Sequence, residues 1–246
     1  MNTTKKIDLG KTIEKSFEIY KKNFWLVGIA FMFLTFALVT LYSIAIQTFY
    51  TGDNILEDIK KLNTANISST AKLVFFVVLV SVTVLTAPFT AGILKMMKET
   101  DETEKTNFNA LFFYVNSSYF SKIVLSTFII SIINFLYSSS IDFIFKNNFL
   151  GEILSFVGSV SISVLTFTML PNIIFGNLSA MDAISKSVTE CKSNFFQILL
   201  LIIIGTLIGY LGIFALCIGI FFSFPIFFAI QYSVYDSLEV KFKDKA

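Results

Sequence analysis

The chain has 246 residues, of which 55% are hydrophobic and 15% are charged, whereas a typical soluble domain carries about 25% charged residues. Its net charge is only +2, so no nucleic-acid partner is expected. There is no histidine, which excludes histidine-ligated haem and iron centres and a Ser–His–Asp triad. The composition predicts an all-α, polytopic membrane protein, and its abundant Lys, Asn, Ile and Phe are typical of an AT-rich bacterial genome.

The apolar residues come in runs long enough to cross a membrane, for which about 20 residues are needed. The first run, residues 24–50, exceeds the roughly 7–15 apolar residues of a secretory leader, so we expect it to remain as a span. The last run, residues 194–235, has 42 residues without a charge and must form two spans, with a turn near Gly209 and Gly212. The single membrane domain, residues 1–246, thus has six expected spans, at about residues 24–50, 73–97, 120–137, 153–175, 194–210 and 213–235.

The lysines are distributed unevenly between the two sides of such a protein. With six spans, both termini share one side with segments 95–122 and 176–193, and that side carries fifteen lysines against four on the other. Basic residues are enriched in cytoplasmic loops. We therefore expect a multi-pass protein of the bacterial cytoplasmic (inner) membrane, with both termini in the cytoplasm. Neither Cys191 nor Cys217 lies in an outer segment, so no disulfide is expected.

The segment before the first span is repeated before the fifth. IEKSFEIYKKNFW (13–25) and ISKSVTECKSNFF (184–196) superimpose with an offset of 171 residues, and six of the fourteen positions from 12 to 25 are identical. In both copies apolar residues recur every three or four positions, as on one face of an α-helix, with lysines on the polar face. We predict amphipathic, interfacial helices on the cytoplasmic membrane surface at residues 8–23 and 179–193.

Each repeated helix is expected to turn into its span at a corner. Asn23 and Phe24 form this corner in the first copy, and Asn194 and Phe195 form it in the second. Asparagine side chains can bond to the backbone groups that a bend frees. These four residues are therefore predicted to shape the entry into spans one and five.

A third, diverged copy is predicted at residues 107–119, where aromatic and aliphatic residues have a similar spacing. The chain has three prolines, Pro88, Pro171 and Pro225, and the second, fourth and sixth spans hold one each. Proline is tolerated in membrane helices and kinks them. The chain therefore reads as three diverged units, each an interfacial helix followed by a pair of spans whose second member carries a structural kink.

The two segments 13–25 and 184–196, each followed by a helical pair, resemble a broad family of bacterial six-helix integral membrane domains of unknown function. In that family a helix with Ser, several further residues and then Lys-x-Asn-Phe precedes a span. Such domains occur alone as uncharacterised inner-membrane proteins, and also fused to glycerophosphodiester phosphodiesterases. The resemblance covers roughly residues 8–238 and includes no catalytic domain. It implies a phospholipid setting and carries over no catalytic residue.

No constellation of catalytic, cofactor-binding or metal-ligating residues is found in the sequence, so no enzyme activity, cofactor or metal is expected. Lys15 and Ser16, like Lys186 and Ser187, are neighbours that do not face each other on a helix, so a solvated polar face is expected there rather than a Ser–Lys dyad. The acidic stretch ETDETEK (99–105) is expected to be a solvated loop.

Two functions stay open. Asn134 and Asn172, the asparagines within the third and fourth spans, are expected to bridge helices. With no acidic residue in the spans, we expect a structural or accessory protein that contacts membrane lipids or an unidentified membrane-protein partner. The alternative is a facilitative transporter or channel for a neutral or lipidic solute, which can work with Ser, Thr and Asn alone.

Overall fold

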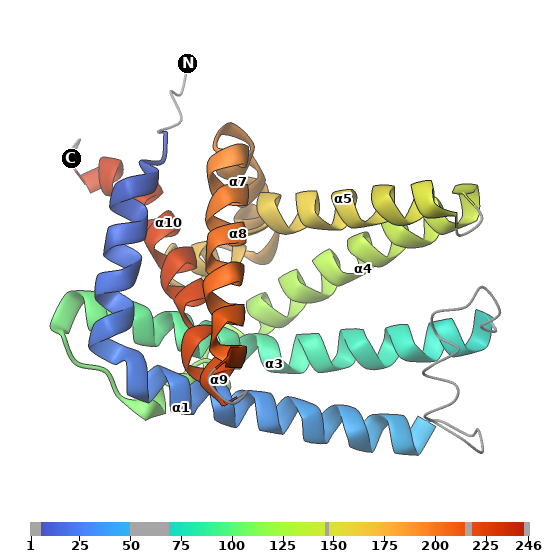
Figure 1. The fold of residues 1–246 in the computed structure, drawn as a ribbon, viewed down its shortest axis with the longest axis horizontal. Coiled ribbons are helices and arrows are strands. Elements are labelled where there is room, and N and C mark those ends of the chain that lie inside the picture. Colours follow the sequence, from blue (N-terminus) through green and yellow to red (C-terminus); the bar gives the residue numbers. More distant parts are fainter. Residues whose placement is uncertain (1–5, 50–68, 146–147, 215–217, 244–246) are drawn as a thin grey trace.

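The structure is a computed structural model that describes residues 6–49, 69–145, 148–214 and 218–243 (Figure 1). These residues form helices and turns, and none of them belongs to a β-strand, as the composition predicts. In chain order the elements are α1 (Leu9–Phe49), α3 (Ser69–Thr103), the 3₁₀ helix η1 (Phe108–Phe112), α4 (Phe120–Phe145), α5 (Phe149–Leu165), α6 (Met169–Ile174), α7 (Ala180–Ser193), α8 (Phe195–Leu211), the 3₁₀ helix η2 (Gly212–Phe214), α9 (Gly219–Ser223) and α10 (Ile226–Lys243).

The molecule divides into four apolar arms and a body from which they extend. In Figure 1 the later part of α1 and helices α3, α4 and α5 run side by side toward one end, whereas α8 runs across their direction. We call residues 35–49, 69–85, 125–145 and 149–163 the arms, and the other described residues the body. Among the described residues, five segments are long and apolar enough to cross a membrane: Leu9–Ala45, Phe76–Thr103, Phe120–Phe145, Phe149–Ile174 and Phe195–Phe214.

The sixth expected span, residues 213–235, is not one continuous helix. Its described residues are divided among η2, α9 and α10. Pro225 lies between α9 and α10 and has no N–H to continue a helical ladder. α10 has 18 residues, and four of them near its end are charged. For these reasons α10 is not among the five segments that could cross a membrane by length and composition.

Helix α1 differs from the expected boundary between an interfacial helix at 8–23 and a span from residue 24. It is a single helix of 41 residues, and Figure 1 shows it bending without a break. The Asn23 amide donates to Thr100 Oγ1 at 2.8 Å, across to α3, instead of capping a new helix. The expected chain break at Asn23 and Phe24 is therefore absent.

The second copy does break at the expected corner. α7 ends at Ser193, Asn194 has φ −122° and ψ 25°, and α8 begins at Phe195. Asn194 Nδ2 donates to the Glu190 carbonyl at 3.2 Å, one of the backbone groups left free at a helix end. The start of α7 is capped by Ser179, whose side chain accepts from the Asp182 N–H.

The segment proposed as a third copy, residues 107–119, is not an α-helix. It forms the short 3₁₀ helix η1 and then turns, up to the start of α4 at Phe120. η1 lies against α3 so closely that a Cβ atom on Gly92 would be 2.2 Å from the Leu111 carbonyl oxygen. This backbone contact and the Asn107 cap, which accepts from Asn109 N at 3.0 Å, favour the tighter turn.

The three prolines have different surroundings. Pro88 lies inside α3, which continues through it. Pro171 is in α6, just after the turn that separates α5 from α6. All three prolines are buried, so their effects on helix direction are fixed by the packing around them.

The core lies in the body, and α10 contributes to both of its parts. One cluster joins α1, α3, η1, α6 and α10 around residues such as Ile19, Leu94 and Ala229. The other joins α5, α7, α8 and α10 around residues such as Cys191, Leu201 and Ile230. The apolar side chains of the first copy, Ile13, Phe17 and Tyr20 among them, pack on this second cluster. The stripe predicted to face the membrane therefore contacts protein.

Candidate functional site

Lys15 of α1 lies between two carboxylates from distant helices. Its Nζ is 2.8 Å from Asp101 Oδ2 on α3 and 2.8 Å from Asp236 Oδ2 on α10. The Tyr232 hydroxyl also donates to Asp101 Oδ2, at 2.9 Å. The three charged side chains keep between 25% and 31% of their surface exposed, so each ion pair adds little stability by itself. Their joint effect is to fix the positions of α1, α3 and α10 relative to one another.

Lys186 of α7, the residue equivalent to Lys15 in the repeat, contacts α10 in a similar way. Its ammonium bonds to Glu239 Oε1 and lies 3.6 Å from Glu190 Oε1 on its own helix. Asp236 and Glu239 are three residues apart, so they lie on one face of α10. That face receives one lysine from each copy.

The break between α5 and α6 is buried, and side chains from other helices complete its hydrogen bonding. Ser187 of α7 donates to the Leu165 carbonyl at 2.9 Å, and Gln231 of α10 donates to the Phe167 carbonyl at 2.7 Å. Pro171 cannot donate to Phe167, four residues earlier, because it has no N–H. The side chain of Gln231 therefore replaces the bond that the proline removes.

A polar cluster lines this break. Thr168 Oγ1 lies 3.1 Å from Ser187 Oγ and 3.3 Å from Glu190 Oε2, and Asn172 Nδ2 donates to Glu190 Oε2 at 3.2 Å. Asn172 Oδ1 is buried and has no hydrogen-bond partner. Cys191 Sγ is 3.6 Å from Thr168 Oγ1, and burial raises the pKa of the Cys191 thiol. These contacts hold the break between α5 and α6 in place within the body. The raised pKa keeps the Cys191 thiol protonated.

The two sequence copies have the same pattern of burial. Residues 12–18 and 183–189 agree in burial at each of the seven equivalent positions. Ser16 and Ser187 are both buried, and so are Asn23 and Asn194. Ser16 donates to the Thr12 carbonyl at 2.6 Å, so neither serine hydroxyl is aimed at the neighbouring lysine. The expectation of a solvated polar face was wrong for the two serines, whereas Lys15 and Lys186 are partly exposed and ion-paired.

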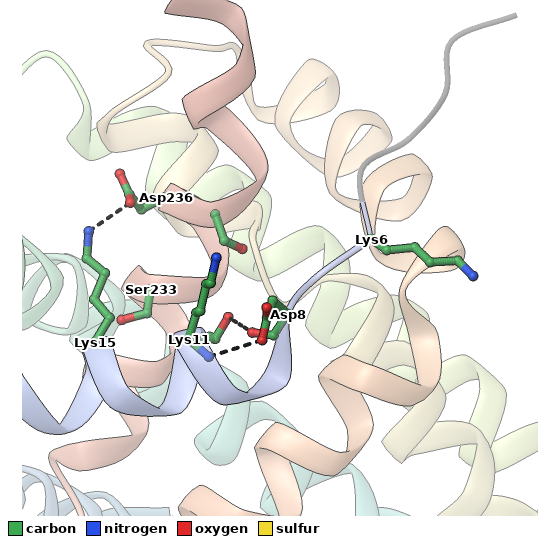
Figure 2. Close-up of a pocket in the computed structure, with 8 residues that line it drawn as sticks. Lys6, Asp8, Lys11, Lys15, Ser233 and Asp236 are labelled. Carbon is green, nitrogen blue, oxygen red and sulfur yellow. Dashed lines mark hydrogen bonds and ion pairs between the residues drawn. The ribbon is translucent and has the colours of Figure 1, made fainter. Parts of the chain in front are cut away.

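A surface pocket of about 350 Å³ lies between the start of α1 and the end of α10 (Figure 2). Lys6, Asp8, Lys11 and Lys15 line it from the α1 side, and the α10 side contributes Ser233 and Asp236. Figure 2 shows Lys11 pointing from α1 toward α10, whereas Lys6 extends away. The pocket is polar and carries both signs of charge.

The remaining residues singled out in the sequence serve helix packing. The Phe24 ring lies 5.5 Å from the Phe222 ring of α9, and Phe195 packs against the second hydrophobic cluster. Asn134 accepts a hydrogen bond from Ser159 at 2.9 Å and so bridges α4 and α5. Within the described residues, no group of three or more His, Cys, Asp or Glu could hold a metal ion.

Four acids that pair with the repeated lysines were missed in the sequence: Asp101, Glu190, Asp236 and Glu239. The stretch 99–105 was expected to be a solvated loop, but α3 continues to Thr103 and carries Asp101 to Lys15. The sequence contained a signal for the continuation of α3, though not for its contact with Lys15, because Leu94, Met97 and Asp101 recur at intervals of three and four residues and share a helix face.

Comparison with known proteins gives no relative. The chain matches no protein-family model, no curated protein and no solved structure. The assignment of a function therefore depends on the residues and geometry described above.

Proposed function

We propose that the protein is a non-enzymatic integral protein of the bacterial cytoplasmic membrane, with a structural or accessory role exercised through contact with lipids or with a partner membrane protein. The alternative is a facilitative transporter or channel for a neutral or lipidic solute. The resemblance to six-helix bacterial membrane domains is part of this proposal, as is the arrangement of six spans in three diverged units.

The observation that carries the proposal is the exposure of the arms. Only 11% of the most apolar stretch of α4 and 22% of that of α5 and α6 is buried within the protein. Large side chains are exposed along these helices, including Leu136, Phe143 and Phe156. Contiguous apolar surface of this extent is unfavourable in water and is compatible with lipid tails as the surrounding solvent.

The side of the membrane is proposed from the lysines and supported by the position of the helix ends. The start of α1 and the end of α10 lie on the same side of the molecule, away from the outer ends of the arms (Figure 1). Fifteen of the nineteen lysines belong to that side if the chain crosses six times. Single cysteines at positions 103 and 185, tested in intact cells, should be protected from an impermeant maleimide. Labelling of either from outside would contradict the proposed orientation.

One feature favours the transporter alternative. The helix formed by α5 and α6 is broken beside the buried Thr168 and Asn172 and the partly buried Glu190. Broken helices with polar side chains at the break form substrate sites in several transporter folds. In this protein, however, Ser187 and Gln231 already occupy the carbonyls of Leu165 and Phe167 at the break.

Reconstitution into liposomes separates the two functions. For a structural or accessory protein we expect no saturable flux of neutral solutes such as glycerol, and no accelerated phospholipid movement between leaflets. Saturable flux that is lost in Asn172→Leu and retained in Asn134→Leu would favour the transporter, because Asn172 lies at the buried break and Asn134 bridges two arms.

A further inference from the structure

We propose that the pocket between the start of α1 and the end of α10 binds a phosphate group, carried by a membrane lipid or by a small soluble ester. Lys11 and Lys6 supply positive charge, and Ser233 supplies a buried hydroxyl. The inference rests on the proposed lipid contact only where a lipid is the source of the phosphate. Binding of a soluble phosphate stands without it.

The positive and negative charges at the pocket are distributed unevenly. Three lysines and two aspartates line it, and Asp101, which pairs with Lys15, is a third carboxylate beside it. Lys15 is already engaged with Asp236 and with Asp101, at 2.8 Å each. No described acid pairs with Lys6 or Lys11. Lys6 and Lys11 are left with Asp8 as the one other charged residue on their side of the pocket, a local excess of one positive charge. A phosphodiester carries one negative charge, which would neutralise this local excess.

Neither aspartate that lines the pocket has a described ion pair with Lys6 or Lys11. The Asp8 carboxylate accepts the Lys11 backbone N–H at 3.1 Å, at the start of α1. Asp236 is held on the Lys15 side. The Lys11 ammonium can therefore approach an anion between α1 and α10, and the long Lys6 side chain can turn toward the same place from the rim.

Ser233 gives the second, independent reason for a ligand. Ser233 is 1% exposed and belongs to the residues that line the pocket, and its buried hydroxyl oxygen has no hydrogen-bond partner. A buried polar atom without a partner is costly, so such an atom beside a cavity indicates a missing acceptor or donor. A phosphate oxygen is an acceptor to which the Ser233 hydroxyl can donate once its side chain rotates toward the pocket.

The other two hydroxyls that line the pocket are occupied. Thr12 Oγ1 donates to the Asp8 carbonyl at 2.7 Å, and Ser237 Oγ donates to the Val234 carbonyl at 2.8 Å. Ser233 is thus the hydroxyl with a proton to spare. The volume of about 350 Å³ falls within the range of roughly 300–1,000 Å³ that is usual for small-molecule sites, and leaves room for a phosphate and part of a headgroup.

The test uses the full-length protein in detergent and two probes. Inorganic phosphate is titrated in thermal-unfolding experiments against chloride at equal ionic strength. Phosphatidylglycerol is titrated in native mass spectrometry, with diacylglycerol, which has no phosphate, as the lipid control. The variants are Lys6→Gln with Lys11→Gln, and Ser233→Ala. The matched control is Lys21→Gln with Lys192→Gln, which removes two exposed lysines that have no described ion-pair partner.

For the site variants we expect the double lysine change to abolish binding and Ser233→Ala to weaken it by about tenfold. Ser233→Ala should not lower the melting temperature of the unliganded protein, because the hydroxyl it removes has no partner. A response to inorganic phosphate with this dependence identifies a soluble phosphate as sufficient, and a response to phosphatidylglycerol alone identifies the lipid. If neither probe binds, or if the control variant loses binding equally, the proposal is wrong. That result would leave the liposome flux experiment unaffected.

Discussion

The two copies of the repeated segment, residues 12–25 and 183–196, agree in burial at twelve of fourteen equivalent positions although their backbones differ. The first is part of the unbroken helix α1, and the second ends α7 and starts α8. Both place a buried serine beside a lysine that contacts α10. The periodic spacing of the side chains therefore determines which face is buried. Whether the helix continues past the asparagine depends on the hydrogen-bond partner of that asparagine's side chain.

The asparagines show this difference directly. Asn23 donates across to Thr100 Oγ1, so its side chain contributes to contact between α1 and α3. Asn194 donates to the Glu190 carbonyl and accepts from the Ile7 N–H at 2.9 Å, so it completes the end of α7 and also holds the chain before α1. The same residue type thus joins two helices in one copy and separates two helices in the other.

The largest expected effect comes from filling the shared buried position. Ser16→Leu and Ser187→Leu should each destabilise the protein by about 2–3 kcal/mol, because both sites are closed and an added side chain must displace its neighbours. Chemical unfolding in detergent measures the loss. Glu14→Leu and Ser185→Leu, at the exposed equivalent positions, should change stability little. Equal effects at 185 and 187 would contradict the burial pattern.

Replacing the two asparagines should lower the free energy of unfolding by smaller and unequal amounts. Asn194→Ala should cost about 1–2 kcal/mol, because it removes a helix-end bond and leaves the Ile7 N–H unpaired, and Asn23→Ala about 1 kcal/mol. Combining each change with Thr100→Ala sharpens the comparison, since only Asn23 should show coupling with Thr100. Coupling between Asn194 and Thr100 would show that the two asparagines act alike.

The ion pairs that Lys15 and Lys186 form with α10 should contribute less to the free energy of unfolding than the asparagines do. Double-mutant cycles for Lys15 with Asp236 and for Lys186 with Glu239, using Met and Asn or Gln replacements, should each give a coupling of about 0.5–1 kcal/mol that falls as salt is added. Lys15 with Asp182, which it does not contact, serves as the control cycle. A coupling that does not respond to salt would mean that the pairs are more deeply desolvated than their exposure indicates.

The smallest effect is kinetic and concerns Cys191 in a Cys217→Ser background. Burial raises the pKa of this thiol, so little thiolate is present at neutral pH and the maleimide reaction should be slow until the protein is unfolded. Raising the pH within the folded range should accelerate labelling. Ser185→Cys, on the exposed face of α7, is expected to react at once, with peptide mass spectrometry assigning the sites. Rapid labelling of Cys191 in the folded protein would contradict its burial.

Patterns in the sequence predicted the positions of the helices better than they predicted which helices contact each other. The apolar runs gave the arms, and the spacing of residues 179–193 gave a helix whose bounds agree with α7 to within one residue. The run 213–235 did not form one helix, because Pro225 interrupts the ladder. The partners of Lys15 and Asn23 could not be predicted, since contacts with residues 101 and 100 depend on how α1 and α3 pack, which no local pattern specifies.

The position of α10 has a consequence for the order in which the molecule can be built. α10 supplies Asp236 to Lys15, 221 residues earlier in the chain, and Gln231 to the buried break at Phe167. It is synthesised after every other described helix. During synthesis, therefore, the arms can enter the lipid one after another before α10 is available. Until then both hydrophobic clusters of the body lack the side chains that α10 contributes. The arms can therefore assemble during translation, whereas the body can complete its packing only after α10 has left the ribosome.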